Sequence, residues 1–444
     1  MKKKVTKGDI NRLGDKIRKE YGNFSSDTLD ELQAYRTSHK ESLSQVFQIL
    51  LNLRKKVRRD SIVTYRIKRF ESIIEKIVFR EKGMKFSRMG DIAGCRIIVQ
   101  NNREAYAFEH KIRQVLNVKN AENDYIKRPK KNGYKSLHLY VTLPDNDKTI
   151  EIQIRNQVDH NWATLVEITD LLFDSQLKEY GKDKKLERLH YLLSKDKDEL
   201  DYYEVKEVAK IVKDYRYLDK LNSIFSRNYL EVRKNWLEIE KKHRYRFFLI
   251  ESSVNEIPKI EAYDNFDEAE SKYYDKFKEN NDANVVLTHL HKPNYKQISI
   301  AYSNYILTMH SFVDEFSKLF EKLIIHSLQI DRHYDFLKFF DLYYNNLTNR
   351  FINEIKEASY SNNTTDSIPN SKSRKESKKE KEWRVEINKN FKDSERKVNK
   401  FRRQLNANMP KGKFKKWRTK RTLKRISKKY EKKIKKELNG IIDL

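Results

Sequence analysis

Three short runs rich in β-branched residues constrain the fold of this chain more than any other feature. They lie at 92–99, 137–143 and 149–155, where Ile, Val, Leu and Thr predominate, a composition typical of strands. Pro-Asp-Asn-Asp at 144–147 predicts a turn between the last two runs, and 104–118 has the apolar spacing of a helix. Residues 45–180 are therefore expected to form an α/β domain with a mixed β-sheet flanked by helices.

The rest of the chain divides by composition. Residues 1–44 are expected to form an N-terminal helical segment, and apolar residues at three- and four-residue steps across 62–78 predict an amphipathic helix before the first strand. Residues 181–358 are predicted to be a mostly helical accessory region, with strand-like runs at 245–250 and 284–288 as a small α/β part. The polar stretch 359–373 predicts a linker, and 374–444 a basic tail, helical or disordered.

Positive charge is concentrated in that tail. The 444 residues include 95 Lys and Arg against 65 Asp and Glu, a formal charge of +30. From Ser371 to Leu444 there are 29 basic and 9 acidic residues. Such a surplus attracts polyanions, so phosphates or nucleic acid are the expected partners.

The chain contains one cysteine, Cys95, and no run approaching about 18 consecutive apolar residues. One cysteine excludes an internal disulfide and fits a reducing compartment. We therefore expect a cytoplasmic protein without a membrane span.

Two carboxylates on neighbouring predicted strands form the first candidate site. Asp91 stands at the start of the first strand and Glu151 in the third. Mg²⁺ is held in many phosphate-handling sites by one or two carboxylates plus phosphate oxygens, so this pair is a candidate magnesium site. Either residue alone is more often a salt-bridged surface acid.

Cations surround these acids in the sequence. Lys127, Arg128, Lys130, Lys131 and Lys135 flank Gly133, and Arg66, Lys68 and Lys76 lie in the preceding segment. A loop of this kind suits a polyphosphate, although a lysine-rich loop is usually a solvated turn. Tyr134, Ser136 and His138 alternate and share a strand face, where a cross-strand or core role is the simpler interpretation.

The ordered string of these residues resembles the synthetase domain of RelA/SpoT-type alarmone synthetases over residues 45–180. The matching motifs, in chain order, are Arg66-Ile-Lys68 with Ser72 and Lys76, Asp91-Ile-Ala-Gly94-Cys-Arg96, Asp124-Tyr125-Ile126 with Pro129-Lys130, Asn132-Gly133-Tyr134-Lys-Ser136-Leu-His138 and Glu151-Ile-Gln153-Ile-Arg155.

The resemblance implies a nucleotidyltransferase-like sheet and a pyrophosphokinase that moves the β,γ-pyrophosphate of ATP onto a ribose 3′-hydroxyl of GDP or GTP, with Mg²⁺ as cofactor. It implies that Asp91 and Glu151 are catalytic and bind the metal, Glu151 alternatively taking the proton of the attacking hydroxyl. The residues implied for ATP are Arg66, Lys68, Lys76 and Arg96. Those implied for the acceptor are Lys130, Tyr134, Ser136, His138, Gln153 and Arg155.

Departures from the family pattern leave the acceptor open. The chain lacks the His-Asp dipeptide of the family's hydrolase domain, so hydrolysis of the product is not expected. The spacing from Trp162 to Glu167 resembles the toxic and phage-defence branch, some of whose members modify the 3′-CCA end of tRNA or make adenosine alarmones. A tRNA acceptor, and a neutralising partner protein, are therefore alternatives.

The tail has its own alternatives. After Pro410, apolar residues from Phe414 to Leu438 recur at helical spacing among dense Lys and Arg. RNA or ribosome binding, an anionic membrane surface and a solvated charged helix all fit this pattern. A non-catalytic RNA-binding protein is the remaining alternative for the whole chain.

Overall fold

The computed structural model describes residues 5–119, 123–173, 175, 177, 183–222, 232–233, 235–236, 238–239, 245–252, 258–279, 284–301, 309–330, 332–366 and 378–442. The chain divides into two compact units. Unit 1 comprises residues 1–194 and 231–307, and unit 2 comprises residues 195–230 and 308–444.

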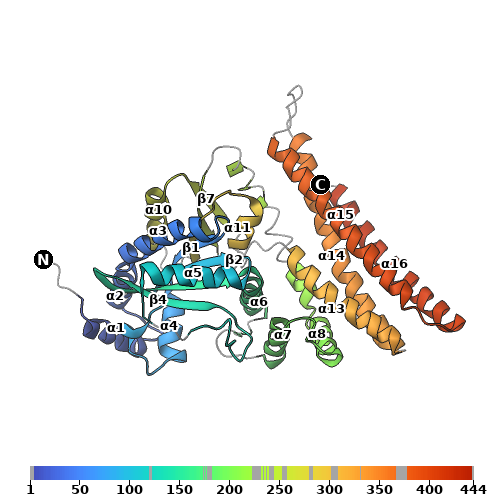
Figure 1. Ribbon diagram of the computed structural model, residues 1–444, viewed down its shortest axis with the longest axis horizontal. Helices are drawn as coiled ribbons and strands as arrows, with labels where there is room; N and C mark the ends of the chain where they lie inside the picture. Colours follow the sequence, from blue (N-terminus) through green and yellow to red (C-terminus); the bar gives the residue numbers. More distant parts are fainter. Residues whose placement is uncertain are drawn as a thin grey trace. The chain divides into compact units, whose positions relative to one another are not determined.

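Unit 1 contains an eight-stranded mixed sheet with the strand order β3-β4-β5-β2-β1-β8-β6-β7. Strands β1, β2, β4 and β7 are labelled in Figure 1. The strands are β1 (Ile62–Ile67), β2 (Ala93–Val99), β3 (Asn117–Val118), β4 (Leu137–Leu143), β5 (Asn146–Asn156), β6 (Phe247–Ser252), β7 (Lys259–Tyr263) and β8 (Asn284–His289). The neighbours β2 and β5 are parallel and the other pairs antiparallel. The predicted mixed sheet flanked by helices is confirmed, including its strands at 93–99 and 137–143.

The two later strand-like runs belong to the same sheet and do not form a separate part. β8 pairs with β1, with Tyr65 opposite Leu287, and β6 pairs with β8. The pairing of β1 with β8 joins residues more than 200 positions apart in the sequence. Local composition does not predict such a pairing.

The helix predicted over 62–78 is wrong in its first part. Residues 62–67 form strand β1, and helix α4 (Phe70–Glu75) follows, continuing as the π-helix η1 (Lys76–Arg80). Three β-branched residues and a tyrosine in Ile62-Val-Thr-Tyr65 favour the strand. Their apolar positions match helical steps only because the strand runs directly into α4.

Helices cover one face of the sheet. They are α3 (Lys40–Val57), α5 (Asn102–Val115) and α10 (Phe266–Glu279), which pack Phe47, Phe108 and Tyr273 into the main core. The strands contribute alternate residues such as Tyr65, Cys95, Ile152 and Leu139 to this core. Because strand side chains alternate, the intervening residues lie on the opposite face.

Smaller helices complete unit 1. Helix α1 (Lys7–Lys19), α2 (Ser26–Thr37), α4, η1 and a 3₁₀ turn (Phe86–Arg88) share a second core around Ile17, Ile73 and Phe86. The other helices are α6 (Gln157–Phe173), α7 (Lys184–Ser194) and α11 (Tyr295–Ala301).

Within its described residues, the regular secondary structure of unit 2 is entirely helical, with turns and short irregular segments such as 195–201 and 408–412 between helices. Its helices are α8 (Tyr202–Asp214), α13 (Met309–Gln329), α14 (His333–Asp366), α15 (Lys378–Ala407) and α16 (Lys413–Ile442). The described part of the tail is therefore helical. The predicted linker begins within α14, and residues 367–373 lie outside the described residues. No helix in the described ranges has the length and apolarity needed to cross a membrane.

Candidate active site

The sheet face opposite the three helices carries most of the predicted site residues. Across four strands, Arg66 lies opposite Gly94, Gly94 opposite Glu151, and Glu151 opposite Tyr140. Two residues further along these strands, Arg96 lies opposite Gln153, and Gln153 lies opposite His138. Side chains of both rows point to the same side, so the register brings together residues that are up to 87 positions apart.

Gly94 allows the backbones of β2 and β5 to approach closely beside Glu151. A Cβ atom at Gly94 would lie 2.8 Å from the backbone oxygen of Glu151, which is too close for a real contact. Since the clash is with backbone, a side chain here would separate the two parallel strands and move Glu151.

Asp91 sits between two lysines just before β2. Its Oδ2 is 2.6 Å from Lys68 Nζ and its Oδ1 is 3.0 Å from Lys76 Nζ. Burial raises the pKa of Asp91, but the two ammonium groups outweigh burial and hold this pKa below its usual range. Asp91 is therefore ionised, and both of its oxygens already contact positive charge.

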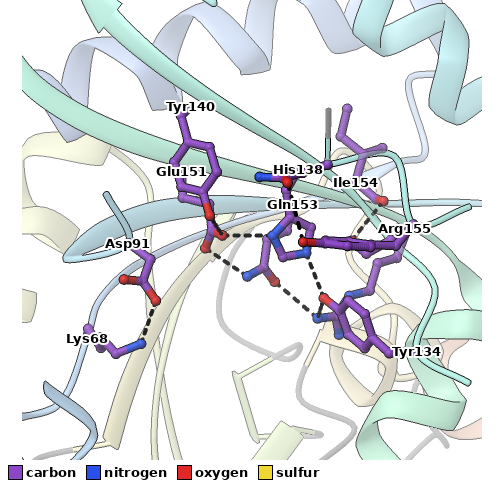
Figure 2. A network of polar contacts seen from close by, with 12 residues as sticks. Lys68, Asp91, Tyr134, His138, Tyr140, Glu151, Gln153, Ile154 and Arg155 are labelled. Atoms are coloured by element: carbon purple, nitrogen blue, oxygen red, sulfur yellow. Dashed lines mark hydrogen bonds and ion pairs between the residues drawn. The ribbon is translucent and has the colours of Figure 1, made fainter. Parts of the chain in front are cut away.

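Glu151 is buried and accepts three side-chain hydrogen bonds (Figure 2). His138 Nδ1 is 2.9 Å and Tyr140 OH 3.1 Å from Oε1, and Gln153 Nε2 is 2.8 Å from Oε2. Burial raises its pKa, but His138 and the Gln153 amide outweigh burial and lower it far below the usual range. Glu151 thus keeps its charge despite its burial.

Tyr134 continues this network away from Glu151. Its hydroxyl lies 2.7 Å from His138 Nε2 and accepts a hydrogen bond from Arg155 Nη2 at 2.6 Å. The guanidinium of Arg155 lies 4.9 Å from the centre of the Tyr134 ring, and Lys130 Nζ lies 5.2 Å from it. Figure 2 shows Tyr134, Arg155, Gln153 and His138 converging on one another.

These neighbours change the acidity of the phenol. Burial raises the pKa of Tyr134, but Arg155 and His138 outweigh burial and lower it from 10.0 to about 7. Burial lowers the pKa of His138, but Tyr134 and Glu151 outweigh burial and raise it. These opposite shifts favour the phenolate of Tyr134 and the imidazolium of His138 over the neutral pair.

We expect one tyrosine to ionise near neutral pH. Because the folded pKa of Tyr134 lies below its ordinary value, its ionisation stabilises the fold fully above about pH 10, and this stabilisation is lost as the pH falls through about 7. The difference in phenolate absorbance between the wild type and Tyr134→Phe measures this titration. It should shift to alkaline pH in Arg155→Gln, and a wild type without phenolate below about pH 9 would contradict the expectation.

The remaining predicted residues take different positions. Arg66 is exposed on the face and Arg96 is partly buried there, where burial, Arg155 and Arg66 lower the Arg96 pKa to about 9. Ser136 is buried and donates to the Ile154 carbonyl at 3.3 Å, and a hydrogen bond between its side chain and Tyr134 also helps to lower the pKa of Tyr134. Gly133 has a φ of 90°, and a Cβ there would collide with Ser194.

Two neighbours of the site were not predicted from sequence as site residues. Tyr140 contacts Glu151, and Tyr125 stacks edge-on to both Tyr134 and His138 at centroid distances of 6.0 and 5.3 Å. The alternation His138-x-Tyr140 carries the signal for Tyr140, because it places both residues on one face. Tyr125 lies in a loop, and its position depends on the tertiary fold.

Residues 65–171 match the family described as "Region found in RelA / SpoT proteins". This match confirms the predicted resemblance, and the chain carries a RelA/SpoT region that includes Asp91, Tyr134 and Glu151.

Similarity to individual proteins is limited to this part of the chain. The chain is 37% identical over 116 residues to the GTP pyrophosphokinase YwaC of Bacillus subtilis, covering 22% of this chain and 53% of that protein. It is 32% identical over 143 residues to a guanosine-3′,5′-bis(diphosphate) 3′-pyrophosphohydrolase of Borreliella burgdorferi, covering 31% of this chain and 20% of that protein. The chain therefore spans about half or less of these relatives.

Among solved structures, the small alarmone synthetase 1 of Bacillus subtilis bound to pppGpp is similar, with 23% identity and a TM-score of 0.32. The match covers 37% of this chain and 90% of that one.

Proposed function

We propose that unit 1 is an ATP-dependent pyrophosphokinase that transfers the β,γ-pyrophosphate of ATP to the ribose 3′-hydroxyl of GDP or GTP. The observation that carries this proposal is the placement of two ionised carboxylates near Lys68 and Lys76: Asp91 just before β2, and Glu151 on β5. Transfer of such a group depends mainly on positioning and on neutralising phosphate charge, which these residues supply. The similarity to a GTP pyrophosphokinase supports the guanosine acceptor.

The lysines have a second role in this proposal. Lys68 and Lys76 both donate hydrogen bonds to Asp91. The triphosphate of the donor competes for the same ammonium groups, so its binding releases oxygens of Asp91. Lys68 is half-buried, and burial lowers its pKa. Exchange of one anion for another is therefore easier than leaving this ammonium group without an anion.

The residues fit a magnesium ion bound partly by substrate. Asp91 and Glu151 offer hard oxygen ligands, and within the described ranges no group of three or more His, Cys, Asp and Glu side chains is placed to hold a metal. Two carboxylates completed by phosphate oxygens match the way proteins hold Mg²⁺. When bound, Mg²⁺ would neutralise charge on the transferring phosphates.

The electrostatics favour one of the two roles implied for Glu151. A general base works best with a pKa near the working pH, whereas the hydrogen bonds from His138 and Gln153 hold the Glu151 pKa far lower. Glu151 is therefore proposed to bind the metal and to orient His138, and proton abstraction by Glu151 is the less favoured role.

Tyr134→Ala tests the acceptor side. The Tyr134 ring is proposed to stack on the acceptor base, so its loss should raise the KM for GDP about tenfold or more while changing the KM for ATP little. Initial rates of AMP release at varied GDP and ATP measure both constants. Tyr203→Ala, which removes an exposed tyrosine of unit 2, is the control, and an equal rise in both KM values would contradict the assignment.

A tRNA acceptor is the second candidate, and α16 is the observation that favours it. Between residues 413 and 436 this helix exposes thirteen Lys and Arg side chains against one acid, Glu431. Over a length of about 36 Å this is about one cation per 3 Å, close to the ~3.4 Å axial spacing of phosphates along one strand of a duplex. Exposed Phe414 and Trp417 stack at 5.9 Å between ring centres, and Arg421 lies over Trp417.

The packing of α16 disfavours a membrane as its partner. Ile426 and Tyr430 are buried, and the Tyr430 hydroxyl donates to the Asp341 carbonyl of α14 at 3.0 Å. A helix that binds a bilayer inserts its apolar face, whereas here the middle of that face, at Ile426 and Tyr430, is already packed against α14. RNA is therefore the proposed partner of the exposed basic face.

Charge reversal on α16 tests this partner. Lys420→Glu with Lys424→Glu should weaken binding of deacylated tRNA and reduce the slope of log K against log salt by about 1.4 to 1.8, because each lost phosphate contact removes about 0.7 on a single strand and about 0.9 on a duplex. If tRNA is the acceptor, its KM should rise more than kcat falls. Lys210→Glu with Lys213→Glu on α8, two lysines that are also exposed, is the matched control, and an unchanged slope in the α16 variant would contradict RNA binding there.

A further inference from the structure

A cavity of about 330 Å³ with a mixed polar and apolar lining lies in unit 1 at the far end of the sheet from Asp91. Its lining comes from the loop before β1, the end of β2, the start of α6 and the segment 292–300. Glu151 of the candidate active site and Gln157 of the cavity lining are six residues apart along β5 and the start of α6. At the rise of a β-strand this is about 20 Å, so the cavity lies well away from the active site. The volume falls at the lower end of the range of small-molecule sites, ~300–1,000 Å³.

Three polar atoms of the lining are buried without a hydrogen-bond partner among the described residues. They are Arg58 Nε, Ser61 Oγ and Gln297 Oε1. Ser61 as a whole is 4% exposed. Buried polar groups are usually paired in folded proteins, so three unpaired ones around a single cavity make it a candidate site for a polar ligand.

The lining brings two cationic side chains to the cavity. Arg58 and Lys292 line it, with Asp60 as the acid of the lining and Glu104 Oε1 3.6 Å from Arg58 Nη1. The parallel strands β2 and β5 both end here, and α5 and α6 begin here. Helix N-termini favour anions, and ligands in α/β sheets commonly bind at the carboxyl ends of strands.

We propose that this cavity binds a small phosphate monoester. The phosphate contacts Arg58, Ser61 and Lys292, whose groups can all donate hydrogen bonds to its oxygens. The organic part of the ligand lies against the apolar side chains of the lining, Ile62, Ile98 and Ile300. The Gln297 carbonyl oxygen accepts from a polar group of the ligand or from water. This site is separate from the proposed pyrophosphate-transfer site and does not depend on that activity.

Calorimetric titration of the full chain with phenyl phosphate, inorganic phosphate and phenol tests the proposal. Phenyl phosphate should bind more tightly than either fragment. Arg58→Gln and Ser61→Ala should each weaken it, with Arg58→Gln losing about tenfold. Arg59→Gln, at an exposed neighbouring arginine outside the lining, should bind as the wild type does. A melting temperature for each variant shows that the fold is intact, and Ser61→Ala serves if Arg58→Gln is unfolded.

A second variant separates this site from the proposed active site. In Asp91→Asn, binding of phenyl phosphate should persist. Loss of binding in Asp91→Asn but not in Arg58→Gln or Ser61→Ala would place the ligand at the active site and overturn the proposal while leaving the proposed function standing. Binding that is absent, or equal in the wild type and both cavity variants, would also overturn it.

Discussion

Glu151→Gln and Asp91→Asn should each lower the rate of pyrophosphate transfer by about a hundredfold or more while leaving the fold intact. Both substitutions keep the size of the side chain and remove the negative charge proposed to gather magnesium at the transferring phosphates. In the Asp91→Asn variant, Lys68 and Lys76 also lose the carboxylate that positions them. AMP release from ATP in the presence of GDP measures the loss.

The control for this prediction is Asp145→Asn. Asp145 is exposed in the turn between β4 and β5, and its replacement should leave the rate unchanged. Circular dichroism and a melting curve show whether the variants are folded. Folded Glu151→Gln and Asp91→Asn proteins with wild-type rates would reject both assignments.

Gly94→Ala should impair both activity and stability. The added Cβ would meet the Glu151 backbone oxygen at 2.8 Å, so β2 and β5 must separate at the point where Glu151 is held. We expect destabilisation by about 1–3 kcal/mol, as for other overpacked positions. We also expect a fall in kcat of about tenfold or more, because displacement of a catalytic group by a fraction of an ångström weakens catalysis.

Gly83→Ala is the matched control for Gly94→Ala. A Cβ at Gly83 would meet nothing within 4 Å, and its φ lies outside the left-handed region. Alanine there should be neutral or stabilising by up to about 1 kcal/mol. Equal stability and activity in the two alanine variants would show that the close approach of β2 and β5 does not matter.

Local composition predicted the positions of β2, β4 and β5. It did not predict strand β1, nor which strands pair with one another. Alternation within 137–143 and 149–155 already places His138 with Tyr140, and Glu151 with Gln153 and Arg155, on one face of each strand. It does not determine that β5 lies beside β2, which brings Gly94 opposite Glu151. That contact depends on the register of a parallel pair, and register is a tertiary property.

β1 shows why periodicity alone misleads. Its apolar residues merge with those of α4 into an apparent helical repeat, yet the strand is needed to place Arg66 opposite Gly94. The contacts of Lys68 and Lys76 with Asp91 likewise require the turn from β1 into α4 and η1. The family resemblance identified Arg66, Lys68, Lys76 and Asp91 as site residues. Their contacts with one another could be seen only in the folded structure.

Incubation of the full chain with γ-labelled ATP, magnesium, and GDP, GTP and deacylated tRNA in competition tests the central claim most directly. The account predicts equimolar AMP and labelled acceptor, with label on GDP or GTP, and loss of this label in Glu151→Gln. Label on tRNA alone would retain the pyrophosphokinase reaction but reject the guanosine acceptor. Label released as orthophosphate, or ADP in place of AMP, would contradict pyrophosphate transfer itself.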